Sequence, residues 1–152
     1  MIYSILMDMN IHIASDHAGF EMKKTLIEYL QSRGHTVTDH GAFTYDSTDD
    51  YPDFISKVAS TVSDETDSRG IIFGKSGQGE AMAANRQAGI RAGVFYGGNL
   101  EIVKLLREHN NSNILSLGAG FISEDEAKDA VKIWLETPFS GDERHIRRIS
   151  KF

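Results

Sequence analysis

A glycine-rich turn in the middle of the chain carries the first chemical signal. The segment 74–79 follows the apolar run 70–73 and leads directly into Glu80 and an Ala-rich stretch. A turn between a strand and a helix points backbone N–H groups outward, and the helix dipole favours an anion there. The spacing matches neither G-x-G-x-x-G nor G-x-x-x-x-G-K-[ST], which argues against a nucleotide. The candidate oxyanion or phosphate cradle consists of Gly74, Lys75, Ser76, Gly77 and Gly79.

Other polar residues have the types that proton transfer and anion binding need. Glu80 follows the turn, Asp16-His17 follows an apolar run, His109-Asn110 ends a helix-like segment, and the residues after Pro138 are basic. Each also has a structural explanation: Glu80 complements a helix dipole, the histidines are turn or surface residues, and the basic tail is a solvated face. Glycines at a tight turn are equally explained by backbone geometry. Only convergence of these groups on one edge of a fold favours function.

Strand-like and helix-like segments alternate along the chain. Apolar runs at 11–14, near 37, and at 70–73, 91–95 and 113–117 predict strands. Helical spacing predicts helices over 20–30, 54–62, 80–88, 99–109 and 123–134, with Ser123 as the N-cap of the last and Glu126 as its capping-box partner. The alternation predicts a Rossmann-like three-layer αβα sandwich around a five-stranded parallel sheet.

Such a fold binds ligands beyond the carboxyl ends of its strands. We therefore expect Asp16-His17, the turn 74–79 and His109-Asn110 to be neighbours in space. The chain is expected to form one domain over residues 1–152. Residues 1–8 are expected to be a short N-terminal extension, with Met7 and Met9 as alternative starts, and residues 138–152 a basic C-terminal tail.

Composition narrows the classes of function. The chain has 16 Lys plus Arg against 22 Asp plus Glu, a net charge of −6, which argues against nonspecific binding of nucleic acid or anionic membranes. It has no cysteine, which excludes disulfides, thiolate metal sites and thiol nucleophiles. No apolar run approaches the roughly 18–20 residues of a membrane helix, and no basic residue precedes the mildly apolar start. The expected location is the cytoplasm.

Five stretches together resemble one protein family. From Asn10 to Ile149 the chain is similar to the ribose-5-phosphate isomerase B group of the RpiB/LacAB sugar-phosphate isomerases. The matching stretches are Ser15-Asp16-His17-Ala18-Gly19-Phe20, Asp50-Tyr51-Pro52, Gly74 to Arg86, Glu108-His109-Asn110-Asn111, and Thr137-Pro138-Phe139-Ser140 leading to Arg144-His145 and Arg147-Arg148.

The resemblance implies aldose–ketose interconversion through a cis-enediolate, with ribose 5-phosphate and ribulose 5-phosphate as substrates. One version of the family uses a cysteine before the glycine-rich turn as the base, and the other a glutamate after it. Here those positions hold Gly74 and Glu80, so Glu80 is the expected base. A carboxylate partly removed from water has a raised pKa, which suits this task. No metal and no organic cofactor are expected.

The resemblance also assigns roles to other residues. Asp16 and His109 assist ring opening, Asn110 contacts substrate oxygens, and the turn amides with Ser76 stabilise the enediolate. His17 lines the site and Tyr51 helps to close it. Arg144 and Arg148 bind the substrate phosphate from a neighbouring subunit, because the planar guanidinium can donate two parallel hydrogen bonds to phosphate. A homodimer with shared active sites is implied, with a tetramer left open.

Two departures from the family pattern keep alternatives open. Gly120 stands where a phosphate-binding arginine is usual after the fifth strand, and Lys75 stands at a usual glycine. One hypothesis is that Lys75 restores part of the charge. The alternatives are an isomerase of a hexose 6-phosphate, such as allose or galactose 6-phosphate, and a non-catalytic sugar-phosphate-binding module. The presence together of Glu80, Asp16 and His109 argues against the last, because a pure binder needs no base.

Overall fold

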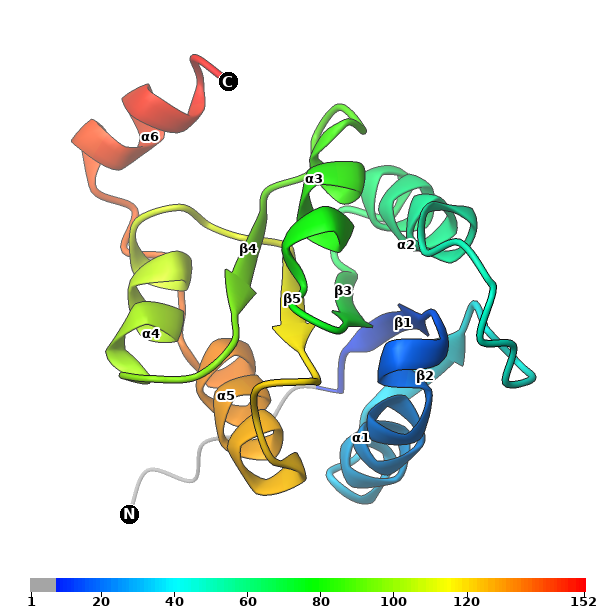
Figure 1. Cartoon of the computed structure of the whole chain (residues 1–152). Helices are drawn as coiled ribbons and strands as arrows, with labels where there is room; N and C mark the ends of the chain where they lie inside the picture. The colour runs from blue at the N-terminus through cyan, green and yellow to red at the C-terminus, as the bar shows by residue number, and fades with distance from the viewer. Residues whose placement is uncertain (1–7) are drawn as a thin grey trace.

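The computed structural model describes residues 8–152, and these form one parallel sheet with helices on both faces (Figure 1). The strand order is β2-β1-β3-β5-β4. The expected α/β sandwich with a five-stranded parallel sheet is confirmed. The elements are β1 (Asn10–Ser15), the 3-10 turn η1 (His17–Gly19), α1 (Phe20–Ser32), β2 (Thr36–Asp39), α2 (Pro52–Asp64), β3 (Arg69–Gly74), α3 (Gln78–Asn85), β4 (Ala92–Phe95), α4 (Glu101–Glu108), β5 (Ile114–Gly118), α5 (Glu124–Glu136) and α6 (Glu143–Ile149).

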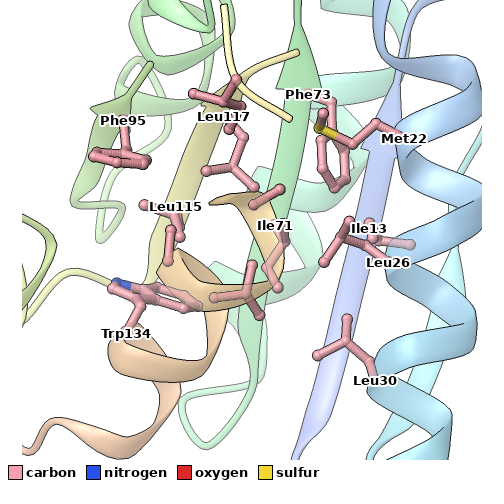
Figure 2. Close-up of a cluster of buried hydrophobic side chains, with 14 of the residues drawn as sticks. Ile13, Met22, Leu26, Leu30, Ile71, Phe73, Phe95, Leu115, Leu117 and Trp134 are labelled. Carbon is pink, nitrogen blue, oxygen red and sulfur yellow. The ribbon is translucent and has the colours of Figure 1, made fainter. Parts of the chain in front are cut away.

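Two hydrophobic clusters hold the layers together, because alternate residues of each strand face opposite sides of the sheet. Ile71 and Phe73 of β3 face α1, α4 and α5, while Ile72 faces α2 and α3. The larger cluster contains the fully buried Trp134 of α5 (Figure 2), whose indole Nε1 donates to Ser112 Oγ at 2.7 Å. Both faces of the central strands are therefore buried, as the apolar runs predicted.

Because the strands are parallel, the carboxyl ends of β1, β3 and β5 lie at the same edge of the sheet. Ser15, the last residue of β1, lies opposite Phe73, and Gly74 lies opposite Gly118. In the sheet, β1 lies between β2 and β3. After β1 the chain forms β2 on one side of it and then crosses to form β3 on the other side. The order of the strands thus reverses between β1 and β3, which is where ligands bind in open α/β sheets.

Helix boundaries follow local chemistry. Helix α2 begins with Pro52, whose missing N–H is not needed in a first turn. Ser123 caps α5 as expected, since its Oγ accepts from the Glu126 amide at 3.1 Å. Helix α3 ends at Asn85, three residues before the expected end, where the Asn85 side chain bonds both backbone groups of Ala92.

The C-terminal segment differs from the expectation of a plain basic tail. Residues Glu143–Ile149 form α6, with Asp142 as its N-cap accepting from the Arg144 amide at 2.9 Å. The expected extension at 1–8 lies outside the described residues except for Asp8, whose Oδ1 accepts from the Thr36 amide at 3.1 Å. None of the helices in residues 8–152 combines the length and apolar character needed to span a membrane.

Candidate active site

The glycine-rich turn connects β3 to α3 and is held against the end of β5. The backbone of Gly77 has φ +78°, a left-handed conformation that glycine adopts without strain, and its carbonyl accepts from Ser116 Oγ at 2.6 Å. A Cβ on Gly118 would lie 2.6 Å from the Ser76 carbonyl oxygen, so the two backbones meet closely. The amides of Ser76, Gly77 and Gly79 have no hydrogen-bond partner within residues 8–152. These are the donors that a bound anion would take.

Ser76 also keeps a proton to donate. Its Oγ accepts from the amide of Gln78, the first residue of α3, at 3.3 Å. A hydroxyl that accepts a hydrogen bond still has its own O–H. Ser76 can therefore join the turn amides in binding a substrate oxygen.

Glu80 is buried beneath this turn, with 4% of its surface exposed. A Cβ added to Gly74 would overlap Oε1, Cδ and Oε2 of Glu80. The carboxylate therefore occupies the space that any side chain at position 74 would need. Burial raises the pKa of Glu80, and the nearby charge of Asp16 raises it further. The raised pKa expected of a catalytic base is present.

Asp16 lies beside Glu80 at the end of β1. Its Oδ1 accepts from the Ala18 amide at 3.0 Å and so caps η1. Burial raises the pKa of Asp16, with the Ala18 hydrogen bond acting in the opposite direction. Two carboxyl groups with raised pKa values thus meet at the β1–β3 boundary, and such perturbed groups cluster at functional sites.

His17 follows Asp16 and is paired with Asp49, which the sequence interpretation did not single out. His17 Nδ1 lies 2.6 Å from Asp49 Oδ1. The ligand atoms of Asp16, His17 and Asp49 lie within 4.8 Å of one another. Because Asp49 Oδ1 and His17 Nδ1 already bond to each other, we assign no metal to this group.

Tyr51 and Lys75 border the turn on opposite sides. The Tyr51 hydroxyl lies over Gly79, where an added Cβ would come within 2.5 Å of Oη. Lys75 is exposed and runs past Gly120: a Cβ on Gly120 would lie 2.9 Å from Lys75 Cγ, and the Gly120 amide donates to the Lys75 carbonyl at 2.9 Å. A side chain at position 120 would therefore begin in space that Lys75 now uses.

His109 and Asn110 do not lie at this edge, and the expectation that they neighbour Asp16 within one chain is wrong. They follow α4, which runs back along the sheet and ends near the starts of β4 and β5. Asn110 shares a cavity of about 490 Å³ with Ala92 and Ser112, which lie at that end of the sheet. A helix that follows a parallel strand runs back across the sheet and ends at the opposite edge, so residues after α4 lie at the starts of the strands.

The basic residues of α6 lie with His109 at this second edge. The rings of His109 and His145 stack with centroids 4.3 Å apart, and the Ser140 amide donates to the Glu108 carbonyl at 3.2 Å. Arg144 and Arg148 are exposed on α6, which projects beyond the end of α4 away from the strand arrowheads (Figure 1). One chain thus carries the expected site residues as two separate groups.

Comparison with known proteins decides the family. A family model described as Ribose/Galactose Isomerase matches residues 11–152. The chain belongs to this family.

Members of the ribose/galactose isomerase family match almost the whole chain. Ribose-5-phosphate isomerase B of Mycolicibacterium paratuberculosis is 41% identical over 141 residues, which is 93% of this chain and 87% of that protein. The structure of ribose-5-phosphate isomerase B from Mycoplasma genitalium with bound ribulose 5-phosphate has a TM-score of 0.90 at 38% identity, covering 95% and 94% of the two chains. The enzyme from Thermotoga maritima has a TM-score of 0.88 at 41% identity, covering 94% and 96%.

Proposed function

We propose that the chain interconverts ribose 5-phosphate and ribulose 5-phosphate, with Glu80 as the base that moves the proton. The observation that carries this proposal is the Glu80 carboxyl group, buried against Gly74 beneath a turn whose Ser76, Gly77 and Gly79 amides have no partner in the described part of the chain. It is supported by membership of a family whose matched relatives are ribose-5-phosphate isomerases B. A sensor of sugar phosphates would need the amides but not the buried base.

The arrangement suits proton transfer through an enediolate. Glu80 takes the proton from C2 of the open-chain aldose and returns it to C1, while a proton moves from O2 to O1. The raised pKa of Glu80 brings its protonated and ionised forms closer to balance, which both halves of the step require. The Ser76 hydroxyl and the amides of Ser76 and Gly77 stabilise the charge that develops on O1 and O2.

We further propose that a second copy of the chain completes each site. His109, Asn110, Arg144 and Arg148 are grouped at the edge opposite to Glu80. One chain cannot present both groups to one small molecule, whereas a symmetric dimer can pair each edge with its complement. In this dimer Asp16 and the partner's His109 assist ring opening, and the partner's Arg144 and Arg148 bind the phosphate.

Mixed dimers test the shared site. Glu80→Gln and His109→Ala proteins, each inactive alone, are co-expressed or exchanged. If sites are shared, each mixed dimer has one intact site, and a random mixture regains about a quarter of wild-type activity. If both residues act from one chain, every site keeps a defect and no activity returns.

The substrate is tested by initial rates on ribose 5-phosphate, allose 6-phosphate and galactose 6-phosphate, with Glu80→Gln as the control. We expect the highest kcat/KM on ribose 5-phosphate and loss of turnover in the control. A hexose phosphate as the best substrate would mean that Gly120 and Lys75 mark a different phosphate position. If the protein binds a sugar phosphate but converts none of the three, it is a sugar-phosphate-binding module and not an enzyme.

A further inference from the structure

The loop between β2 and α2 carries a buried carboxylate that the mechanism above does not use. The side chain of Asp49 is 9% exposed. Its Oδ1 accepts from the His17 amide at 3.1 Å and contacts ring Nδ1 of the same residue at 2.6 Å. Its Oδ2 is buried and has no hydrogen-bond partner within residues 8–152. Because burying an unpaired carboxylate is costly, the contacts with His17 are what hold Asp49 in this position.

These two contacts fix the ring of His17. A carboxylate oxygen only accepts hydrogen bonds, so Nδ1 carries the proton in this pair. Nε2 is then the ring nitrogen left for another partner, and the His17 side chain is 33% exposed. The ring of Tyr45 meets that of His17 edge-on, with centroids 6.3 Å apart, which further limits its rotation.

The charged groups that act on His17 from the neighbouring elements are carboxylates. Asp49 and Asp46 belong to the loop after β2, and Asp16 to the end of β1. The hydrogen bond that His17 Nδ1–H donates to Asp49 is the largest influence, and it raises the pKa of His17 above its usual value. The ring therefore stays positively charged over a wider pH range, and its Nδ1 also lies 3.9 Å from Asp16 Oδ2.

We propose that Asp49 is a positioning residue that holds His17 protonated and oriented, so that Nε2–H donates to an anionic oxygen of the substrate. The proposal rests on the sugar-phosphate isomerase function. Asp49 itself does not touch the substrate. Its contribution is to keep a positive charge on His17, beside the buried carboxyl group of Asp16.

The test compares Asp49→Asn with Asp53→Asn, an equal charge change at an exposed position in the first turn of α2. Titration of the ring signals by NMR, assigned with a His17→Gln protein, measures the protonation of His17 without substrate. We expect the His17 midpoint to fall in Asp49→Asn and to stay unchanged in Asp53→Asn. An unchanged midpoint in Asp49→Asn would overturn the proposal.

Kinetics then test the functional consequence. Because a hydrogen bond from a charged donor is stronger than one from a neutral donor, we expect KM for ribose 5-phosphate to rise about tenfold in Asp49→Asn near neutral pH. The rise should shrink below the lowered midpoint, while kcat changes little. In a His17→Gln background Asp49→Asn should have no further effect, and a full additional effect there would contradict the proposal. A wild-type protein inactive on every sugar phosphate would refute the isomerase function, and the NMR titration would still report on the Asp49–His17 pair.

Discussion

The two groups of site residues differ in how the fold holds them. At the carboxyl edge, Glu80 and Asp16 are buried and supported by backbone that the sheet fixes. At the opposite edge, Arg144 and Arg148 are exposed on a short helix that projects from the molecule. A proton-transfer base must be desolvated and held in one geometry, which the chain's own core provides. The arginines that we propose as phosphate ligands only need to reach the phosphate, and in the proposed dimer the second subunit brings them.

The two groups also differ in charge. The carboxyl edge gathers Glu80, Asp16 and Asp49, whereas α6 carries three arginines and a single acidic residue, Glu143. Opposite charges on the two edges favour an association that places one against the other and disfavour pairing of like edges. This difference in charge supports the proposed dimer in which the sites are shared.

The largest effect is expected from Glu80→Gln. Loss of the base should lower kcat by about 10²–10⁴-fold, the usual contribution of general acid–base catalysis. Binding of ribulose 5-phosphate, measured by calorimetry, should persist because the amides and arginines remain. If Glu80→Gln keeps more than a tenth of the wild-type kcat, a residue other than Glu80 is the base.

Gly74→Ala should come next. The new methyl group overlaps the Glu80 carboxylate, whose flexible end can move away, so the fold is kept and the base is displaced. A misplacement of about 1 Å costs about 10²-fold in kcat. Rates and circular dichroism check this together: kcat should fall while the circular dichroism spectrum stays that of the wild type.

A change at the second edge should act on KM rather than on kcat. Arg148→Ala removes a charged donor to phosphate and should raise KM about tenfold or more with little change in kcat. Arg147→Ala, an exposed arginine on the same helix, is the matched control. A fall in kcat with an unchanged KM would contradict the assignment of phosphate binding to Arg148 and of proton transfer to the other edge.

Lys75→Gly should have a smaller effect of the same kind. Lys75 is exposed and lies beside Gly120, so it adds an exposed charge near the cradle. Exposed ion pairs contribute about 0.2–1 kcal/mol, which corresponds to a rise of at most about fivefold in KM. An unchanged KM would show that Lys75 does not replace the missing arginine.

The smallest effect concerns stability. Because folding raises the pKa of Glu80, the native state binds its proton more tightly, and stability falls as pH rises from the unfolded pKa, near 4.5, through the folded pKa. Glu80→Gln lacks this penalty and should be more stable than wild type at pH 7. Urea unfolding at one protein concentration should show this difference closing below about pH 4. If the wild type is more stable than Glu80→Gln at pH 7, burial of the ionised Glu80 carboxylate does not destabilise the fold.

Local patterns were enough for most of the fold. Apolar runs located the strands, because both faces of the central strands are buried, and Ser123 marked the start of α5. Helix α6 was missed because its residues are mostly exposed and show no apolar stripe. Asp49 was missed because nothing local separates it from Asp46 and Asp50 in the same acidic run.

By itself the sequence determined the strand–helix alternation, the position of the glycine-rich turn and the absence of cysteine, since these depend on residue type and short spacing. The tertiary structure alone decided which residues share an edge. It buried Glu80 against Gly74, paired His17 with Asp49, and carried His109 and α6 to the far end of the sheet. Each helix runs back across the parallel sheet, and this direction decides at which edge the following residues lie. It is a property of the assembled fold and not of any local segment.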